Sequence, residues 1–354
     1  MKLNKLILTA FAGALFFASC SSDDDSSNAP KGAYDNGLLI LNQGGYNVGN
    51  ASISFLSEAN ELENNVFSLV NGGLLGDTGQ DIGLHGDYAY IVVNNSHKIE
   101  IVNRYTFEGV ATVTTGLDNP RYIAFSGDKG YVTNWGDPVD TTDDYVAVLD
   151  LSTNTVSSSI EVVEGPEAIV ENNGNLYVAH KGGYGYGNTV TVINAAAGNV
   201  TTSIAVGDVP NSLEIDNGKL YVMGEGAPSW SGTETTGQLT VINLTDNSIS
   251  QNLVFNGITH PTNLVIENNK LYYTINDGIY TMTTSATTLP SAPLFTTTEQ
   301  GVYGVYSFEV KNNKVYVGDA MDYNSNGKVY IYSLTGEKLE EFTVGVIPAG
   351  FYFN

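Results

Sequence analysis

The four histidines are the first residues to consider for chemistry, because imidazole acts both as a general base and as a metal ligand. His85, His97, His180 and His260 are scattered along the chain, and no pair has the spacing of a metal-binding motif. The chain has no Gly-x-Ser-x-Gly motif, and its single cysteine, Cys20, lies near the N-terminus. We therefore expect a binding protein, with no catalytic residues.

One short stretch has the residue types of a cation site. DYNSNG (322–327) matches the first half of a calcium-binding loop, with Asp322, Asn324 and Asn326 at the alternate positions that supply oxygens. The twelfth position of the full motif needs a bidentate Glu, and here it is Ser333. We therefore favour an Asx-rich loop, keep calcium as the alternative, and expect no other cofactor.

Five long segments combine glycine, polar residues and aromatic rings, and they contain both tryptophans of the chain, Trp135 and Trp230. Long loops on a rigid scaffold usually carry function, and rigid aromatic rings give a large contact area at low entropic cost. The segments are QGGYNVGN (43–50), WGDPVDTTDD (135–144), KGGYGYGN (181–188), EGAPSWSGTETTG (225–237) and AMDYNSNG (320–327).

A repeated strand pattern must position these loops. GYVTN (130–134) recurs in degraded form along the chain. The second position of the seven copies is occupied by Leu39, Tyr90, Tyr131, Tyr177, Tyr221, Tyr272 and Tyr316, and successive copies are 41 to 51 residues apart. Each unit contains four short strands, here called A to D, and its A-to-B turn is a cluster of Asn, Gly or Asp. Seven such units predict an all-β, seven-bladed β-propeller of four-stranded antiparallel blades.

The two ends of the chain complete one blade. The first unit begins at strand B, GLLILN (37–42), whereas the chain stops after PAGFYFN (348–354), which reads as a strand A. Pairing these segments would close the ring and remove exposed sheet edges. We therefore expect one propeller domain over residues 37–354, with an extended connection between strands D and A over residues 62–80 of the first unit.

In a four-stranded blade the B-to-C and D-to-A connections lie on the same face of the propeller. The long aromatic segments are all B-to-C connections, so this face is the predicted ligand-binding face. Its candidate residues are Tyr46, Arg121, Asn134, Trp135, Asp137, His180, Tyr184, Tyr186, Glu225, Trp230, His260, Tyr303, Asp319 and Tyr323.

The N-terminal residues read as a secretion signal. Two lysines precede the apolar run LILTAFAGALFF (6–17), which is shorter than the roughly 20 residues that span a bilayer. The stretch up to Cys20 resembles a bacterial lipoprotein signal, although Phe17 stands where the motif usually has Leu. The resemblance implies that residues 1–19 are removed, that Cys20 is lipidated, and that residues 20–36 form a tether. SDDD (22–25) is similar to the acidic tag of surface lipoproteins in Bacteroidetes.

The chain carries a formal net charge of −24, with 14 basic against 38 acidic side chains. Such a field repels nucleic acid and anionic membrane surfaces. We therefore expect no nucleic-acid partner, and membrane contact through the lipid anchor alone.

The repeat units resemble YVTN-type seven-bladed β-propellers, with the pattern running from Tyr131 to Pro166. With the signal and the acidic tag, the chain is similar to the surface propeller lipoproteins of Bacteroidetes that bind cobalamin, and ILNQGGYNVGNASISF (40–55) is the local stretch most like them. The resemblance implies an outer-membrane lipoprotein facing the cell exterior. Its implied function is to capture a small-molecule nutrient, such as a corrinoid, for a TonB-dependent outer-membrane transporter.

Two alternatives stay open at this point. A protein- or glycan-binding surface scaffold would also use exposed aromatics and carboxylates. A propeller enzyme, such as a lyase or quinoprotein, would need a cluster of histidines and carboxylates that the sequence does not assemble. We expect the aromatic side chains of this face to match the flat faces of a corrinoid. Its polar side chains would match the amide rim, and its acidic field the cationic metal centre.

Overall fold

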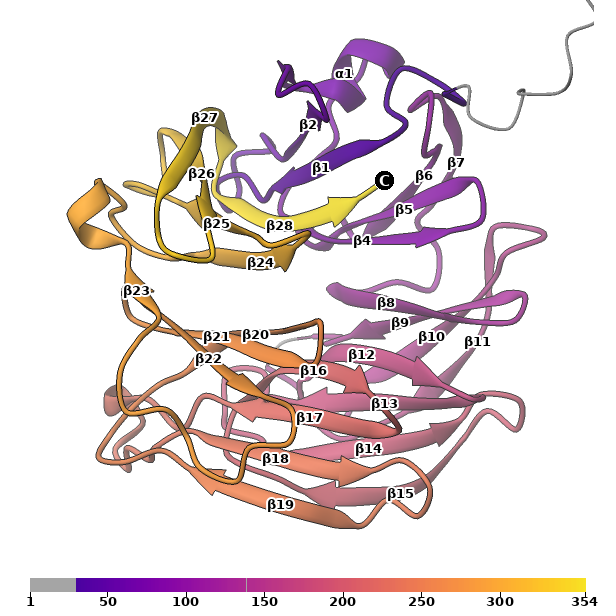
Figure 1. The fold of residues 1–354 in the computed structure, drawn as a ribbon. Helices are drawn as coiled ribbons and strands as arrows, with labels where there is room; N and C mark the ends of the chain where they lie inside the picture. Colours follow the sequence, from indigo (N-terminus) through magenta and orange to yellow (C-terminus); the bar gives the residue numbers. More distant parts are fainter. Residues whose placement is uncertain (1–29, 138) are drawn as a thin grey trace, which may run out of the picture.

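The computed structural model describes residues 30–137 and 139–354, and these residues form a seven-bladed β-propeller (Figure 1). Seven antiparallel sheets of four strands each account for all 28 strands of the described part. The predicted fold class is confirmed. The predicted signal, Cys20 and the acidic tag lie outside the described residues.

The ring is closed by the two ends of the chain, as predicted. The C-terminal strand β28 (Pro348–Phe353) pairs antiparallel with β1 (Gly37–Asn42), and Figure 1 shows the two side by side. The same blade continues outward through β2 (Ser52–Ser57) and the short β3 (Leu62–Glu63). This blade, called blade 1, therefore takes its inner strand from the far end of the chain.

The other six blades follow in sequence order, each from inner strand A to outer strand D. Blade 2 contains β4 (Gly79–His85), β5 (Tyr88–Val93), β6 (Lys98–Asn103) and β7 (Gly109–Val113). Blade 3 contains β8 (Pro120–Ser126), β9 (Lys129–Asn134), β10 (Tyr145–Asp150) and β11 (Thr155–Glu161). Blade 4 contains β12 (Pro166–Asn172), β13 (Asn175–His180), β14 (Thr189–Asn194) and β15 (Asn199–Ala205). Blade 5 contains β16 (Pro210–Asp216), β17 (Lys219–Gly224), β18 (Gln238–Asn243) and β19 (Ile249–Val254). Blade 6 contains β20 (Thr262–Glu267), β21 (Lys270–Ile275), β22 (Gly278–Thr283) and β23 (Phe295–Thr296). Blade 7 contains β24 (Ser307–Lys311), β25 (Lys314–Asp319), β26 (Asn326–Ser333) and β27 (Lys338–Val346).

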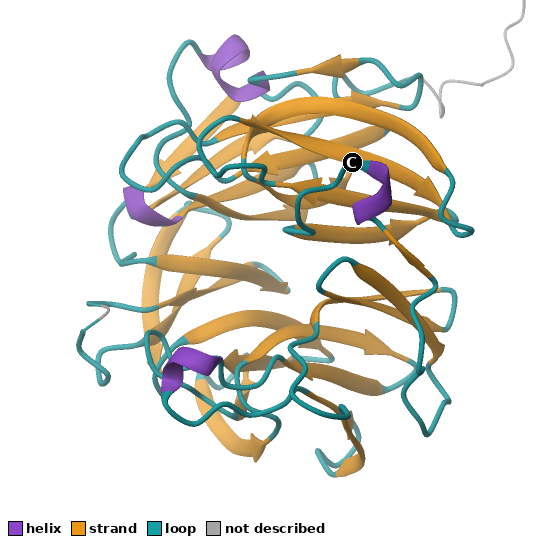
Figure 2. Cartoon of the chain, turned by 90° about the vertical axis from the view of Figure 1, so that its left-hand side faces the viewer, coloured by secondary structure: helices purple, strands orange, loops and turns teal. Residues whose placement is uncertain are grey.

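Short helices occur in the connections between strands (Figure 2). The long D-to-A connection after blade 1 forms helix α1 (Val66–Asn71), whose buried Val66 and Phe67 pack in the core shared by blades 1 and 2. The single-turn helices are η1 (Asn94–Ser96), η2 (Ser229–Ser231) and η3 (Thr298–Gln300).

The A-to-B turns adopt the left-handed backbone that their Asn and Gly residues favour. In blade 4, for example, Asn173 and Gly174 have φ of 50° and 79°, and Asn312 and Asn313 of blade 7 have φ of 52° and 59°. Two consecutive positive φ values match the twist of an antiparallel hairpin. The predicted hairpins are therefore formed as the sequence indicates.

The repeated tyrosine of strand B joins neighbouring blades. The buried Tyr131 and Tyr177 donate hydrogen bonds to Ala195 O (2.9 Å) and Asn247 Oδ1 (3.0 Å), each in the C-to-D turn of the next blade. Tyr221 likewise donates to Thr284 O of the following blade at 3.1 Å. The repeat thus supplies a buried ring and a hydroxyl that fixes the adjacent blade.

The N-terminal segment enters on the face that carries the A-to-B and C-to-D turns. Lys31 Nζ lies 3.3 Å from Asp87 Oδ1 in an A-to-B turn and donates to Tyr105 OH, in a C-to-D turn, at 3.0 Å. Tyr34 packs edge-on against Phe107. Among the described helices, none is long and apolar enough to cross a bilayer.

Candidate functional site

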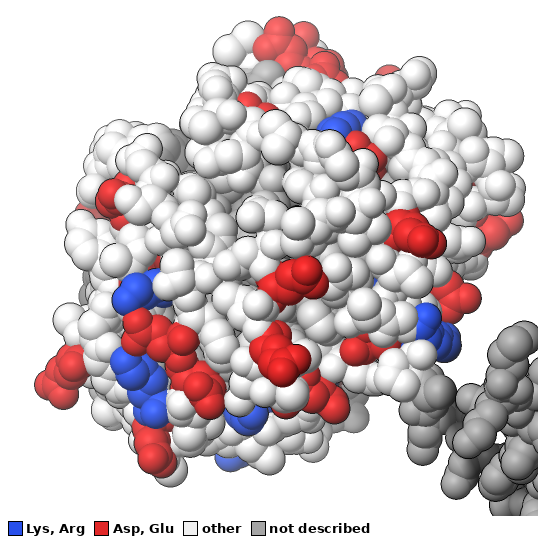
Figure 3. Space-filling model, turned by 90° about the horizontal axis from the view of Figure 1, so that it is seen from above, with Lys and Arg blue, Asp and Glu red and all other residues white. Residues whose placement is uncertain are grey.

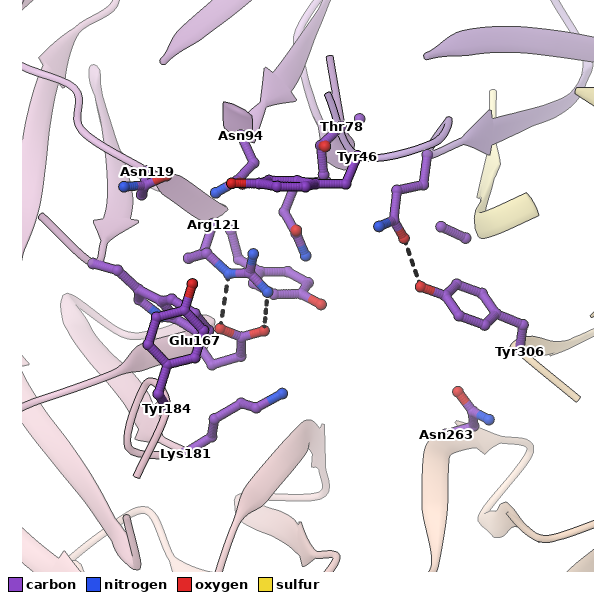
Figure 4. Close-up of a pocket in the computed structure, with 16 residues that line it drawn as sticks. Tyr46, Thr78, Asn94, Asn119, Arg121, Glu167, Lys181, Tyr184, Asn263 and Tyr306 are labelled. Carbon is purple, nitrogen blue, oxygen red and sulfur yellow. Dashed lines mark hydrogen bonds and ion pairs between the residues drawn. The ribbon is translucent and has the colours of Figure 1, made fainter. Parts of the chain in front are cut away.

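A cavity of about 440 Å³ opens where the B-to-C and D-to-A connections meet (Figure 4). Every blade except blade 5 contributes to it, so it lies at the centre of the predicted ligand-binding face. Its lining residues are Gln43, Tyr46, Thr78, Gly79, Gln80, Asn94, Asn119, Arg121, Tyr122, Trp135, Glu167, Lys181, Tyr184, Asn263, Tyr306 and Ala349.

A buried ion pair forms one wall of this cavity. Arg121 is the second residue of β8 and Glu167 the second residue of β12, so adjacent inner strands bring them together. Arg121 donates from Nε and Nη2 to Glu167 at 2.9 and 2.6 Å, and the two side chains are 14% and 6% exposed. Such a bidentate pair fixes both side chains in one orientation.

The charges of the pair stabilise one another. Burial by itself would raise the pKa of Glu167, but the positive charges of Arg121 and then Lys181 hold that pKa below its ordinary value. Burial likewise opposes the charge of Arg121, and Glu167 more than offsets it, so the pKa of the guanidinium is raised. Both groups are therefore ionised at neutral pH.

Trp135 stands over the guanidinium of Arg121. The Arg121 Cζ atom lies 4.3 Å from the indole centroid, and Trp135 Nε1 donates to Pro166 O at 3.0 Å. Tyr184 meets the same indole edge-on, with 6.2 Å between ring centroids. The ion pair thus holds an aromatic platform, and the exposed Tyr184 extends it toward solvent.

Neutral polar groups line other parts of the cavity. Tyr306 OH donates to Gln43 Oε1 at 2.6 Å, so the Gln43 amide nitrogen stays available as a donor. Asn94 and Asn119 each donate their side-chain amide to a backbone carbonyl, Pro120 O at 3.1 Å and Gly136 O at 2.8 Å. The cavity therefore offers amides and hydroxyls that are already oriented.

Four of the predicted residues meet at this cavity: Tyr46, Arg121, Trp135 and Tyr184. Outside the cavity, Tyr186 and Trp230 pack on each other with 5.7 Å between ring centroids, and Trp230 is 75% exposed. The exposed Tyr303 and Tyr323 line a smaller hollow of about 60 Å³ that shares Tyr306 with the main cavity. Of the aromatic residues predicted for this face, three thus line the cavity and two line the neighbouring hollow, whereas Tyr186 and Trp230 lie outside both.

Three other predicted residues are enclosed in the protein. Asn134 and Asp319 are buried, and both hold loop backbone: Asn134 Oδ1 accepts from Asp118 N at 3.0 Å, and Asp319 Oδ2 accepts from Tyr303 N at 2.7 Å. His180 is fully buried without a hydrogen-bond partner for either ring nitrogen, and burial lowers its pKa to about 4. None of these three side chains lines the cavity.

The remaining predicted residues lie in the surrounding loops. His260 bridges Glu225 O and Glu234 Oε1, at 3.0 and 3.2 Å from its two ring nitrogens. Asp137 is exposed and accepts a hydrogen bond from Val139 N. None of these side chains lines the cavity.

The DYNSNG stretch forms an Asx turn. Asp322 Oδ1 accepts from the backbone nitrogens of Asn324 and Ser325 at 3.0 and 2.7 Å, while Asn326 begins β26. Within residues 30–137 and 139–354, no group of three or more His, Cys, Asp or Glu side chains has the arrangement of a metal site. The Asx-turn interpretation accounts for these contacts.

Sequence reasoning missed several residues that line the cavity, notably Glu167, Lys181 and Tyr306. Some of these residues share a position in the sequence repeat. They are the second residue of a strand A, and this residue faces the cavity. It is Gln80, Arg121, Glu167, Asn263 and Ala349 in blades 2, 3, 4, 6 and 1, and in three of these blades it follows a proline.

The charge of the cavity lining differs from that of the chain as a whole, which carries 38 acidic and 14 basic side chains. Acidic side chains also outnumber basic ones on the side of the propeller that Figure 3 shows. The charged residues that line the cavity are Arg121, Lys181 and Glu167, an excess of one positive charge. The acidic field expected for the whole face therefore does not extend to the cavity lining.

A second cavity of about 380 Å³ lies deeper in the channel lined by the inner strands. Tyr122 and Asn263 line both cavities. Glu214 and Glu309 face the deeper one, where burial raises their pKa to about 8 and about 7. The negative charge of Glu309 adds to the rise in the pKa of Glu214, and that of Glu267 adds to the rise in the pKa of Glu309. The deeper chamber is therefore a poor environment for carboxylate charge.

Comparison with known proteins identifies a family. A family model described as "Domain of unknown function (DUF5074)" matches residues 36–354. The chain belongs to this family. The match spans all seven blades, including the C-terminal strand that closes the ring. No curated protein matches the sequence.

Solved structures share the fold of this DUF5074 member. A quinoprotein alcohol dehydrogenase-like protein from Bacteroides thetaiotaomicron has a TM-score of 0.65 at 14% identity, covering 90% of this chain and 78% of that one. Hydrazine synthase from Kuenenia stuttgartiensis has a TM-score of 0.56 at 14% identity, covering 75% and 85% of the two chains. At these identities the likeness shows the propeller fold alone.

Proposed function

We propose that this propeller is a surface lipoprotein that captures a small-molecule nutrient in the central cavity of its B-to-C face, and that it is a binding protein rather than an enzyme. The observation that carries the proposal is the cavity wall formed by Trp135 over the ion-paired Arg121. Pockets of about 300–1,000 Å³ with a few convergent polar groups are typical ligand sites. At about 440 Å³ this cavity is at the small end of that range.

A corrinoid is the ligand class that we propose. A macrocycle larger than the cavity would lie across its mouth, where Tyr46 and Tyr184 are both more than two-thirds exposed. Trp230 is also exposed and packs on Tyr186, which lies in the same loop as Tyr184. Flat apolar rings pack on such aromatic side chains, and the amide rim of the macrocycle would meet the carboxamides of the lining. Part of the ligand would enter the cavity beneath the ring.

The arrangement of the chain supports surface capture. The tether enters on the face of the A-to-B and C-to-D turns, opposite the cavity, because Lys31 contacts Asp87 and Tyr105 there. A lipid on Cys20 would then leave the cavity open to the exterior. A TonB-dependent transporter beside the lipoprotein would take the ligand from that side.

Titration of the purified protein with cobalamin, cobinamide, haem and a glycan panel tests the ligand class. We expect calorimetry to detect corrinoid binding in preference to haem, because no His and Tyr pair lines the cavity as axial ligands. Binding of a glycan without any corrinoid signal at micromolar protein would replace this proposal with the glycan-binding alternative.

The anchor is tested separately. Cys20→Ser should release the protein from membranes and abolish labelling by a fatty-acid probe, since stable anchoring requires lipid chains on this residue. Cys20→Ser should leave ligand affinity unchanged in detergent, because the cavity lies on the opposite face. Undiminished fatty-acid labelling of the variant would contradict the predicted lipidation.

A further inference from the structure

Lys181 is a charged group in the cavity whose ammonium has no ion-pair partner in the described part of the chain. It follows β13, on the B-to-C loop of blade 4, and Figure 4 shows its Nζ pointing into the cavity. Among the described residues, no carboxylate lies within salt-bridge distance of this nitrogen. Glu167, the acid of the lining, is already held by two hydrogen bonds from Arg121.

A second positive group, Arg121, belongs to the same lining. Arg121 uses Nε and Nη2 for Glu167, so its Nη1 remains as a donor that makes no hydrogen bond within the described residues. The amide nitrogen of Gln43 is a further donor, because Gln43 accepts from Tyr306 at its oxygen. The lining thus combines spare N–H donors with one unbalanced positive charge.

This excess stands out against the rest of the molecule. The chain carries 38 acidic and 14 basic side chains, and two of the basic ones line this one cavity. An unpaired ammonium in a partly enclosed site is costly unless an anion or water solvates it. A ligand oxyanion would form charge-assisted hydrogen bonds there, which are about twice as strong as neutral ones.

We infer that Lys181 forms an oxyanion subsite in this lining, so that the ligand carries a single phosphodiester or carboxylate group. The inference rests on the proposed function for the identity of the whole ligand. For a corrinoid it implies recognition of the phosphodiester that cobalamin carries and cobinamide lacks. Lys181 then determines specificity between these two ligands.

The subsite is first tested without any corrinoid. The lysines are reductively methylated with ¹³C, which keeps their charge, and the Lys181 signal is assigned by its loss in Lys181→Gln. Titration with dimethyl phosphate and with acetate should shift this signal saturably, whereas the Lys129 signal, from the opposite face, should not move. A Lys181 signal that responds to neither anion, or only in step with Lys129, overturns the subsite.

The second arm compares cobalamin with cobinamide. Lys181→Gln should weaken cobalamin binding about tenfold, as expected for loss of one charge-assisted hydrogen bond, and change cobinamide binding much less. Lys181→Arg should retain the preference for cobalamin, and Lys129→Gln should affect neither ligand. Equal weakening of both ligands would overturn the assignment of Lys181 to the phosphodiester.

The two proposals fail in different ways. If neither corrinoid binds the unaltered protein, the proposed ligand class is wrong, and the response of Lys181 to dimethyl phosphate still decides whether the oxyanion subsite exists. If corrinoids bind but the Lys181 signal ignores both anions, the ligand class stands and the subsite is wrong.

Discussion

At the scale of single residues, the buried pair of Arg121 and Glu167 determines the shape of the site. Its members come from adjacent blades, and the guanidinium also supports the indole of Trp135. A buried pair of this kind need not add much net stability, but removing one partner leaves an uncompensated buried charge. The pair is therefore a sensitive point at the centre of the ring.

We predict that Glu167→Gln lowers the free energy of unfolding by about 3–5 kcal/mol, because Arg121 loses its counter-charge while staying buried. The double variant Arg121→Met with Glu167→Leu should be closer to the unaltered protein, since it leaves no unpaired charge. Urea denaturation measures both. A single variant that unfolds at the same urea concentration as the unaltered protein would show that solvent already screens the pair.

Residue types and loop lengths predicted part of the site. Trp135 and Tyr184 were found because they lie in long aromatic loops, where function is common. Asn134, His180 and Asp319 were included for their chemistry, but each is the last residue of a strand B, where the side chain turns into the blade. Strand register, rather than residue type, decides which of these groups can reach a ligand.

At the scale of elements, the tyrosine of strand B does two tasks. Its ring fills the space between blades, and in three blades its hydroxyl bonds to the C-to-D turn of the next blade. The spacing of this residue was therefore a reliable guide to the seven blades, whereas their closure was predicted from the strand A that the first unit lacks and the C-terminal segment supplies. The helix α1 was not predicted, because the connection that holds it interrupts the repeat and follows no period.

We predict that Tyr177→Phe destabilises the protein by about 0.5–1.5 kcal/mol, the usual contribution of one hydrogen bond. Tyr90→Phe is the matched control, because Tyr90 is also buried in strand B and its hydroxyl makes no hydrogen bond within the described residues. Thermal unfolding of both variants measures the difference. Equal stability of the two variants would rule out a role for the hydroxyl in joining blades.

At the scale of the whole molecule, the central channel makes stability depend on pH. Burial raises the pKa of Glu214 to about 8 and that of Glu309 to about 7, so the folded protein binds more protons than the unfolded chain. Stability from these groups is complete below their ordinary pKa near 4.5 and is lost as pH rises toward 8. The contribution of these two carboxyl groups should therefore make the propeller more stable at mildly acidic pH than at pH 8.

We predict that Glu214→Gln reduces the fall in melting temperature between pH 5 and pH 8, because the amide stays neutral where the carboxyl must ionise. Substitution of the exposed Glu58 by Gln is the control and should leave the pH profile as it is. Melting temperatures across this pH range measure both. A Glu214→Gln profile that runs parallel to that of the unaltered protein would mean that water in the channel solvates the carboxylate.

The central claim is that ligand binds at the cavity of the B-to-C face, and the two tryptophans give a direct measurement. Trp135 lines the cavity, whereas Trp230 is exposed and is not part of the lining. We predict that Trp230→Phe, which leaves Trp135 as the one indole of the chain, shows saturable quenching on titration with cobalamin, after correction against free tryptophan amide for light absorbed by the ligand. Cobalamin binding by calorimetry without any saturable change in Trp135 fluorescence would contradict the claim, because the ligand would then bind away from this cavity.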